Sequence, residues 1–514
     1  MNASPQPTRM PKQAVAVIGA GQAGLVTARY LKKHGFEPVI FDAASTVGGQ
    51  WNVASPSSAI WPGMRTNTSR ILTAFSDLDH EPTTSIYPSQ TDMLAYLARY
   101  AETTGLRPHL RLSTLVEAVE PAPEAGWLVR SRNSEAVSSE VFERVVVATG
   151  YCRTPDLPAI AGLASFAGSG GAIHSSRYKG AETYRGRSVL VAGCSISALE
   201  IASELAAAGV NIAVAMRRQR YVLQKLLAGV PTDHVAFTRF AAQAGRTLPP
   251  EAIAAAMKQM VVATSGSPEQ FGAPKPDDNI FAAGLTQSQN YLALVAEGRI
   301  APRPWIEAID GPTVCFADGS SQDFDAIILG TGFKLSLPFI EGAAAASLGL
   351  DAGGIDLYDH TLHHDLDGLG FIGLYSLIGP YFPVLELQAR WLAYLWAGLR
   401  PMPSVEIMQE GVAAARARRA GPRDIPMHAL AVLFASRAGV EPRPADWPAL
   451  ERALWFGPLS PASFRLIGPD THPNAEARTV AAALAFNAIT SDVLTSEEAA
   501  RLRAVLPAPH VEAA

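Results

Sequence analysis

Three glycines at residues 19, 21 and 24 form the pattern GAGQAG, whose spacing suits the phosphates of a dinucleotide. Gly19 permits a tight turn, Gly21 lets a pyrophosphate approach the backbone, and Gly24 lets a helix pack closely on a strand. Asp42 follows 23 residues after Gly19, at the end of the apolar run VIFD. A carboxylate there accepts hydrogen bonds from a ribose 2′-hydroxyl and repels a 2′-phosphate. The pattern therefore predicts a site for FAD or NAD.

A second turn, GCSISA, repeats the pattern in altered form at Gly193, Ser195 and Ala198. The small residues still allow a tight turn, although alanine packs less closely than glycine. The acid of the first pattern is absent, and Arg217 and Arg218 follow the next apolar run instead. Guanidinium groups bind a dianionic phosphate through paired, charge-assisted hydrogen bonds. We therefore assign FAD to the first turn and NADPH to the second. The alternative is that both arginines are surface charges.

Each turn lies in a segment that predicts a buried strand, a helix and a second strand. AVAVIGAGQAGLVTARYLKKHG ends its helix at Gly35, and SVLVAGCSISALEIASELAAAG repeats the layout. Two more apolar runs, at 143–151 and 325–334, close on Thr-Gly. Buried parallel strands end in this way where they meet a ligand crevice. The first run therefore predicts Thr149 and Gly150 as cofactor contacts.

The composition is that of a globular protein. The 514 residues are 48% hydrophobic and 17% charged, with a net charge of −5, which gives no reason to expect nucleic acid or an anionic membrane as partner. Cys152, Cys194 and Cys315 form neither a disulfide framework nor a CxxC pair. The chain shows no signal-peptide core, and no apolar run reaches the roughly 18 residues of a membrane helix. We expect a cytoplasmic protein.

With both turns placed, the chain resembles a class B flavin-containing monooxygenase over roughly residues 14–400. The resemblance implies an α/β fold of two Rossmann-like dinucleotide-binding domains, with the NADP domain inserted in the FAD domain and a mostly helical C-terminal extension. Eight stretches in the expected order carry it: GGQW (48–51), RTNTSRILTAFSDL (65–78), YPSQTDMLAYLARYA (87–101), VVVATGY (145–151), EIASEL (200–205), GTGF (330–333), LGFIGL (369–374) and ELQARW (386–391).

The domain boundaries expected from these stretches divide the chain into five parts. The helices after Pro401 could cover a flavin cleft or form the contact of a homodimer, and the pattern does not choose between these roles. The parts are a disordered tail (1–13), the first part of the FAD-binding domain (14–176), the NADP-binding domain (177–330), the second part of the FAD-binding domain (331–400) and the helical C-terminal extension (401–514).

The stretch GGAIHSSRYKG (170–180) matches the GxxxHxxxY portion of the family's FxGxxxHxxxY motif. Gly170, His174 and Tyr178 fit, whereas Phe166 lies four residues before the glycine instead of two. In related Baeyer–Villiger enzymes the final aromatic residue is typically tryptophan followed by Pro or Asp, so Tyr178 followed by Lys179 favours the heteroatom-oxygenating branch. We expect His174 to organise a hinge between the domains rather than to act as acid or base.

The reaction is implied by the same resemblance. NADPH reduces FAD, the reduced flavin takes up O₂ to form a C4a-hydroperoxyflavin, and a nitrogen or sulfur centre of a small organic substrate takes the distal oxygen. Asn67 stands where the family places an asparagine beside the flavin, and its amide could hydrogen-bond the peroxide or the nicotinamide. The predicted catalytic residues are Asn67 and His174. The predicted cofactor-binding residues are Gly19, Gly21, Gly24, Asp42, Gln50, Trp51, Thr149, Gly150 and Gln388 for FAD, and Gly193, Ser195, Ser197, Arg217 and Arg218 for NADPH.

Three other functions remain open from the sequence. A Baeyer–Villiger ketone monooxygenase and an NADPH-dependent flavoprotein reductase would share both turns, as would a flavin-binding scaffold without activity. Oxygenation could also act on a halide or an aromatic carbon, because the motifs would look the same. The His- and Asp-rich stretch YDHTLHHDLDG (358–368) could suggest a metal, but a flavin oxygenase needs none, and we predict no metal site.

Overall fold

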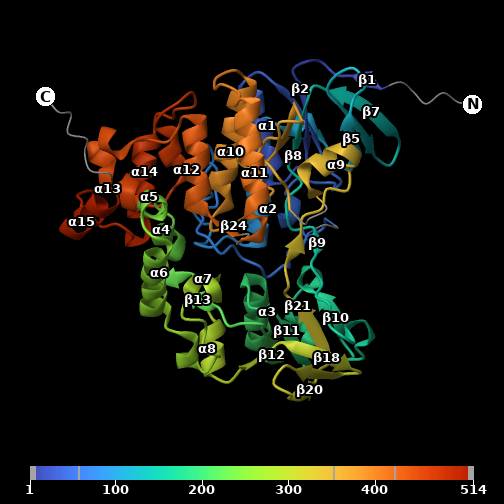
Figure 1. Cartoon of the computed structure of the whole chain (residues 1–514), viewed down its shortest axis with the longest axis vertical. Helices are drawn as coiled ribbons and strands as arrows, with labels where there is room; N and C mark the ends of the chain where they lie inside the picture. Colours follow the sequence, from blue (N-terminus) through green and yellow to red (C-terminus); the bar gives the residue numbers. More distant parts are fainter. Residues whose placement is uncertain (1–6, 56–57, 351–353, 422–423, 507–514) are drawn as a thin grey trace, which may run out of the picture. The chain divides into compact units, whose positions relative to one another are not determined.

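The computed structural model describes residues 7–55, 58–350, 354–421 and 424–506 (Figure 1). Contacts between residues divide the chain into two compact units. The first unit comprises residues 1–58, 69–154 and 333–483, and the second comprises 59–68, 155–332 and 484–514. Segments of the two units thus alternate along the chain: 59–68 and 155–332 of the second unit are inserted in the first, and 484–514 follows it. Among the described residues, no helix is both long enough and apolar enough to cross a bilayer.

A five-stranded parallel sheet forms the centre of the first unit. Its strands follow the order β23-β8-β2-β3-β4. The middle strand β2 (Ala14–Ile18) is completely buried, as expected for a parallel strand covered on both faces. Helix α1 (Gln22–Lys33) starts directly after it. The other strands are β3 (Glu37–Phe41), β4 (Leu110–Arg111), β8 (Arg144–Val147) and β23 (Leu369–Phe371).

A second sheet of the first unit corrects the predicted disordered tail over 1–13. Strand β1 (Thr8–Arg9) pairs in parallel with β7 (Val137–Phe142), and the Met10 amide donates to the Val141 carbonyl. The physical reason is that β7 would otherwise present an edge of unpaired backbone groups. Residues 1–6 of the predicted tail lie outside the described residues. The sheet order is β1-β7-β6-β5, with β5 at Leu115–Pro121 and β6 at Trp127–Arg132.

Helix α10 (Tyr381–Trp396) packs against α1 and against α12 (Met427–Ala438) in the first unit. Fourteen of its residues are buried, so it is a core helix rather than a surface helix. Figure 1 shows α10 beside α1, α11 and α12. The further helices of this unit are α2 (Gln90–Thr103), α9 (Gly342–Leu348), α11 (Val405–Ala417), α13 (Glu451–Phe456) and α14 (Ala475–Leu484, which ends at the unit boundary).

A buried group of charged and hydroxyl side chains joins four distant segments of the first unit. Glu386 accepts hydrogen bonds from the Tyr30 hydroxyl (2.7 Å), from the Ser76 amide (2.7 Å) and from the Ser76 hydroxyl. Arg465 donates to Tyr30 (3.1 Å) and Ser76 (2.5 Å), with its Nη1 3.8 Å from Glu386 Oε1. Glu386 and Arg465 are 2% and 4% exposed. The pairing supplies the partners that buried charges require.

Asp470 extends this group toward the end of α1. Its carboxylate accepts from the Tyr394 hydroxyl (2.6 Å) and lies 2.5 Å from Lys33 Nζ and 3.2 Å from His34 Nε2. Burial alone would raise the pKa of Asp470, but the bonds from His34, Lys33 and Tyr394 hold it below its ordinary value. The segment around Asp470 is therefore part of the core of the first unit.

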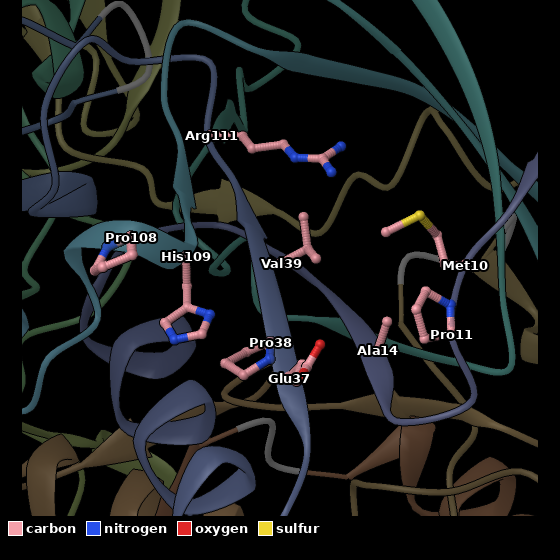
Figure 2. A pocket seen from close by; sticks show the side chains of 9 residues that line it. All are labelled: Met10, Pro11, Ala14, Glu37, Pro38, Val39, Pro108, His109 and Arg111. Atoms are coloured by element: carbon pink, nitrogen blue, oxygen red, sulfur yellow. The ribbon is translucent and has the colours of Figure 1, made fainter.

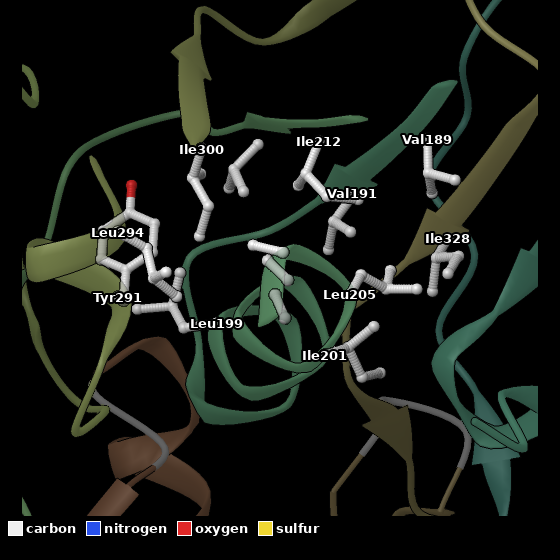
Figure 3. Close-up of a cluster of buried hydrophobic side chains, with 14 of the residues drawn as sticks. Val189, Val191, Leu199, Ile201, Leu205, Ile212, Tyr291, Leu294, Ile300 and Ile328 are labelled. Atoms are coloured by element: carbon white, nitrogen blue, oxygen red, sulfur yellow. The ribbon is translucent and has the colours of Figure 1, made fainter. Parts of the chain in front are cut away.

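The second unit is built on a second five-stranded parallel sheet, ordered β10-β21-β11-β12-β17. Helix α3 (Ile196–Ala207) follows β11 and packs on the sheet. Figure 3 shows Leu199, Ile201 and Leu205 of this helix among apolar side chains of the strands and of α8. The elements are β10 (Gly171–His174), β11 (Ser188–Ala192), β12 (Asn211–Ala215), β17 (Ile300–Arg303), β21 (Ala326–Leu329) and α8 (Tyr291–Ala296).

The second unit also contains helices from the insertion after β12 and from the end of the chain. Helix α15 (Ser496–Val505) packs on α5 (Arg239–Thr247): Gln243 donates to the Val505 carbonyl (3.1 Å), and the Arg501 guanidinium lies 4.5 Å from the Phe240 ring. The contacts thus divide the predicted C-terminal extension (401–514) between the two units at residues 483 and 484. The remaining helices are α4 (Thr232–Ala236), α6 (Pro250–Ser265) and α7 (Ile280–Ala283), and a small antiparallel sheet comprises β18 (Ile306–Asp310), β19 (Thr313–Phe316) and β20 (Ser321–Asp323).

Candidate cofactor and active site

The first glycine turn connects β2 to α1 in the way that its sequence predicts. A Cβ on Gly19, whose φ is +114°, would lie 2.5 Å from the Ala148 carbonyl oxygen. A Cβ on Gly24 would lie 1.8 Å from the Gly19 carbonyl oxygen. Gly21 is the N-cap of α1, so the first amides of this helix have no carbonyl partner within it and can meet a phosphate.

Asp42 lies at the end of β3 and holds the glycine turn. Its Oδ2 accepts from the Ala20 amide (2.7 Å), and its Oδ1 accepts from the Ala44 amide (2.8 Å). Each carboxylate oxygen has a second lone pair. The side chain can therefore bind a ribose hydroxyl while it fixes the turn.

The stretch GGQW lies directly against the first glycine turn. The Gly48 amide donates to the Ala20 carbonyl (3.0 Å), and a Cβ on Gly49 would lie 2.8 Å from the Gly21 Cα. Gln90 donates to the Trp51 carbonyl at 2.5 Å. The structure thus brings Gln50 and Trp51 to the turn, as the sequence predicts for residues that line one site.

Two of the predicted flavin contacts carry buried polar atoms without a partner among the described residues. These atoms are Trp51 Nε1 and Thr149 Oγ1. An unsatisfied buried donor or acceptor costs about 1–3 kcal/mol, so such atoms point to a missing ligand. Gly150 follows with φ +78° and has no atom within 4 Å of its Cβ position among the described residues. These residues and the glycine turn fit a dinucleotide such as FAD.

The structure gives Gln388 partners within the protein. Its Oε1 accepts from the Gly373 amide (3.0 Å) and the Tyr375 hydroxyl (3.1 Å), and its Nε2 donates to three further oxygens of the first unit. The side chain is completely buried. Its hydrogen-bonding capacity is therefore used, and a direct contact with FAD, as the sequence suggested, stays a prediction. What the structure shows is that Gln388 shapes the turn at Gly373.

The second glycine turn connects β11 to α3, and its alanine, Ala198, faces a glycine, Gly330, after the neighbouring strand β21. A Cβ on Gly193, whose φ is +134°, would lie 2.4 Å from the Gly330 carbonyl oxygen. A Cβ on Gly330 would lie 2.7 Å from the Cβ of Ala198. The first turn has the opposite arrangement, with Gly24 on the helix and Ala148 at the end of the neighbouring strand. In the second turn, the missing Cβ of Gly330 therefore leaves the room that the Ala198 methyl group needs.

We expect Gly330→Ala to destabilise the second unit by about 1–3 kcal/mol, because the added methyl overlaps that of Ala198. The double variant Ala198→Gly/Gly330→Ala moves the methyl group to the strand and should be more stable than Gly330→Ala alone. Chemical denaturation of Gly330→Ala, Ala198→Gly and the double variant measures these differences. If the double variant loses as much free energy of unfolding as the two single variants together, or more, the Ala198 methyl and the missing Gly330 Cβ do not compensate each other.

Arg217 and Arg218 are exposed after the end of β12, beyond Met216. The Arg217 guanidinium lies 4.7 Å from the centre of the Trp305 ring, a cation–π contact that limits its motion. Ser195 lies at the start of α3, and its hydroxyl donates to the Gly330 carbonyl (3.4 Å). Ser197 is half-buried in the first turn of that helix. These groups lie at the carboxyl ends of the strands of the second sheet, where parallel sheets bind nucleotides.

His174 lies at the end of β10 and is 4% exposed. Its Nδ1 accepts from the Ser176 amide (3.2 Å), which leaves the proton on Nε2 to donate to the Gly332 carbonyl (2.9 Å). Burial lowers the pKa of His174, although the bond to Gly332 opposes this shift. The imidazole is therefore neutral and joins β10 to the Thr-Gly turn after β21. Both bonds lie within the second unit, and a part for His174 in a hinge between the domains stays a prediction.

Asn67 belongs to the segment 59–68, which the contacts assign to the second unit. The residue is half-buried, and its Oδ1 is covered without a hydrogen-bond partner among the described residues. The neighbouring Thr66 hydroxyl donates to the Thr68 carbonyl (2.8 Å) and holds the turn. Asn67 thus presents a free amide oxygen, as a residue that meets a ligand should.

Several residues of these sites escaped the sequence reasoning. Gly49 and Gln90 fix the GGQW turn, while Gly330 and Trp305 complete the second site. The Thr-Gly signature at the end of β21 already marked the neighbourhood of Gly330. Nothing in the local pattern marks Gln90 or Trp305, because their contacts join distant parts of the chain.

One surface cavity of the first unit lies away from the first glycine turn, where β2 and β3 begin. It is lined by residues that include Ala14 and Glu37, the first residues of β2 and β3, together with His109 and Arg111 (Figure 2). Ligands of open parallel sheets bind at the carboxyl ends of the strands. We therefore do not assign the dinucleotide to this cavity.

A group of potential metal ligands occurs at His363, His364 and Asp365, in the stretch noted in the sequence. The His363 Nδ1 already accepts from the Asp365 amide (3.1 Å), and the ring also bonds the Ser347 backbone. Its lone pair is therefore used within the protein. This geometry gives no support to a metal ion.

Known proteins match this architecture over most of the chain. A family model described as flavin-binding monooxygenase-like matches residues 12–495. The N-oxide-forming dimethylaniline monooxygenase 2 of Oryctolagus cuniculus is 26% identical over 483 residues, which cover 88% of this chain and 89% of that protein.

Two solved structures share the fold. The S-allyl-L-cysteine S-oxygenase from Allium sativum superposes with a TM-score of 0.60 at 23% identity, covering 83% of this chain and 88% of the other. The NADP⁺-bound cyclohexanone monooxygenase from Rhodococcus sp. Phi1 gives a TM-score of 0.61 at 17% identity, covering 85% and 98%. The chain therefore belongs to the flavin-binding monooxygenase-like family, whose members use FAD and NADPH as cofactors.

Proposed function

We propose that this chain is an NADPH- and O₂-dependent monooxygenase that oxygenates a nitrogen or sulfur centre of a small organic substrate. The reaction balances as NADPH, H⁺, O₂ and substrate giving NADP⁺, the substrate oxide and water. The observation that carries the proposal is the opposite charge after two similar glycine turns, Asp42 after the first and Arg217 after the second. One site disfavours a 2′-phosphate and the other favours it, so a single chain binds two different dinucleotides.

We assign FAD to the first unit and NADPH to the second. Bound FAD supplies the redox chemistry with hydride and O₂. Gly19, Gly21 and Gly24 let its pyrophosphate reach the amides at the start of α1, and Asp42 binds its ribose. Trp51 Nε1 and Thr149 Oγ1 supply polar atoms that have no other described partner. The protein thereby orients the cofactor and excludes water from it.

Asn67 is the residue that we place nearest the reacting atoms. Its amide can accept through Oδ1 and donate through Nδ2. The covered, unpaired oxygen supports this role, because a side chain kept for a ligand has no protein partner. His174 serves as a neutral link in the second unit.

Oxygenation of nitrogen or sulfur is favoured over ketone oxygenation by Tyr178 followed by Lys179. The relative from Oryctolagus cuniculus is named for N-oxide formation and the Allium sativum protein for S-oxygenation. The experiment offers a tertiary amine, a thioether and a cyclic ketone separately, with NADPH, and identifies the products. N-oxide or sulfoxide is the expected product. A lactone as the main product would establish the Baeyer–Villiger alternative, and NADPH oxidation with no oxygenated product would favour a reductase.

Replacing Arg217 by glutamine should weaken the binding of NADPH and leave the binding of NADH nearly unchanged. A charge-assisted hydrogen bond contributes about 1.5–3 kcal/mol, so the KM for NADPH should rise roughly tenfold to a hundredfold. Steady-state kinetics with both nucleotides measures the ratio. Arg246→Gln, which removes an exposed arginine from α5, is the matched control and should keep the preference for NADPH. An equal rise of KM for NADPH and NADH in Arg217→Gln would show that this arginine does not bind the 2′-phosphate.

A reducing compartment is part of the same proposal. All three cysteines are free, with Cys194 buried and the other two half-buried. Burial raises the pKa of Cys152 to about 11 and also raises that of Cys194, so both thiols stay protonated and weakly reactive. Mass spectrometry of the protein isolated under alkylating conditions should find three unpaired thiols.

A further inference from the structure

The segment 59–68 is held on the second unit by its first half. Trp61 is 4% exposed and belongs to the apolar core around α3, where its ring lies 5.5 Å from that of Tyr178 in an edge-on contact. Lys179 donates to the Ile60 carbonyl at 3.0 Å. Met64 packs against the same core. The segment is therefore anchored before the chain reaches Asn67.

Glu204 of α3 is the polar centre of this anchor. Its Oε2 accepts from the Trp61 indole Nε1 (2.6 Å), and its Oε1 accepts from the Tyr178 hydroxyl (2.9 Å). A Cβ on Gly63 would lie 3.3 Å from the Glu204 Oε2, so the backbone of the segment passes directly over the carboxylate. Burial, together with the nearby Glu204 charge, raises the pKa of Tyr178, which keeps its hydroxyl protonated as a donor.

We propose that Glu204 is a positioning residue for Asn67: its carboxylate fixes the segment 59–68 on the nucleotide-binding unit and thereby sets the place of the Asn67 amide. The inference rests on the proposed function for its effect on catalysis. An ionised carboxylate suits this contact because it accepts through both oxygens, from the Trp61 indole, which can only donate, and from the Tyr178 hydroxyl. A glutamine keeps one acceptor oxygen for Trp61 and turns its NH₂ group toward Tyr178, so the charge-assisted bond from the Tyr178 hydroxyl is lost.

The same helix offers a matched control one turn earlier. Glu200 also accepts two bonds, from Lys225 Nζ (2.6 Å) and from the Ser288 hydroxyl (3.0 Å). Neither partner belongs to the segment 59–68. Glu200→Gln therefore removes a carboxylate of similar exposure from α3 without touching the anchor.

The test compares Glu204→Gln with Glu200→Gln in the FAD-loaded, full-length protein. A displaced Asn67 should divert NADPH and O₂ to hydrogen peroxide, so the ratio of peroxide to oxygenated product should rise roughly fivefold in Glu204→Gln. That factor corresponds to the loss of one hydrogen bond of about 1 kcal/mol. The KM for NADPH and the FAD content should stay unchanged, and Glu200→Gln should keep the wild-type ratio. A wild-type ratio in Glu204→Gln would overturn the proposal.

Two further variants separate positioning from a general loss of structure. Tyr178→Phe and Trp61→Phe each remove one donor and keep an aromatic ring. Each should raise the peroxide ratio, and neither should add to Glu204→Gln, because all three act through one carboxylate. In an Asn67→Ala background, Glu204→Gln should have no further effect on the ratio. A full additional effect in that background would show that Glu204 does not act through Asn67.

A readout independent of activity distinguishes failure of this inference from failure of the proposed function. Hydrogen exchange of peptides spanning 59–68 should accelerate in Glu204→Gln and stay at the wild-type rate in Glu200→Gln, while β11 stays protected in both. If the wild-type enzyme oxygenates no nitrogen or sulfur probe, the proposed function fails, yet the exchange result still decides whether Glu204 anchors the segment. Unchanged exchange at 59–68 would overturn the anchor itself.

Discussion

Replacing Gly24 by alanine is expected to yield a protein that does not retain FAD. The new Cβ would lie 1.8 Å from the Gly19 carbonyl oxygen and 3.5 Å from a Val17 side chain. Because the Gly19 carbonyl is part of the backbone, it cannot move aside as a flexible side chain can. Helix α1 must therefore shift away from β2, and the turn must open. The amides that α1 offers to the pyrophosphate move with it. The measurement is the ratio of flavin absorbance to protein after purification, with added FAD in excess.

The control for this variant is Gly245→Ala, in helix α5. A Cβ on Gly245 meets no atom within 4 Å among the described residues, and the residue is exposed. Alanine in a helix is favoured over glycine by about 1 kcal/mol, so this variant should bind FAD as the wild type does. Normal flavin content in Gly24→Ala would mean that the tight approach of α1 to β2 is not needed for the cofactor.

Replacing Arg465 by methionine is expected to cost the first unit about 3–5 kcal/mol of its free energy of unfolding, because Glu386 would remain buried without its cation. The loss is large against a typical total of 5–15 kcal/mol. Since Arg465 also bonds Tyr30 of α1 and the Ser76 hydroxyl, FAD retention on heating should fall as well. Thermal unfolding followed by flavin fluorescence measures both effects.

Two comparisons define what this result means. Arg132→Met removes an exposed arginine that pairs with Glu117 on the second sheet of the same unit, and exposed pairs contribute only about 0–1 kcal/mol. The double variant Arg465→Met/Glu386→Leu removes both buried charges and should recover much of the lost stability. A loss in Arg465→Met no larger than that in Arg132→Met would show that the buried pair does not hold the C-terminal segment to α1.

The glycine turns could be predicted because each is a local pattern. Gly19, Gly21 and Gly24 follow one strand and open one helix, so their roles depend on residues close in sequence. Asp42 follows the next strand at a fixed distance, and the structure places its carboxylate on the amide of Ala20. The sequence shows that Ala198 takes, in the second turn, the position that Gly24 has in the first. The compensating role of Gly330 could not be predicted, because this residue lies 132 residues further along the chain.

Contacts between distant segments could not be predicted from local patterns. The hydrogen bonds of the Gln388 amide to Gly373 and Thr361 were not expected, and its contact with FAD stays a prediction. The segment 59–68 lies in sequence among residues of the first unit, yet Trp61 anchors it in the core of the second. Strand β1 forms because β7 leaves an edge open. In each case the contact joins residues that are not neighbours in the sequence, and neither the hydrophobic periodicity nor a turn residue indicates it.

Rapid-mixing absorbance can test whether this chain uses two different dinucleotides to oxygenate a substrate. FAD-loaded protein is reduced without oxygen by NADPH, and in parallel by NADH, and is then mixed with oxygenated buffer in the absence of substrate. We expect faster reduction by NADPH than by NADH. A lasting absorption band that belongs to neither oxidised nor reduced flavin should follow, and it should disappear when a thioether or an amine is added. Immediate return to the oxidised spectrum, with no such band, would rule out a monooxygenase and identify a reductase.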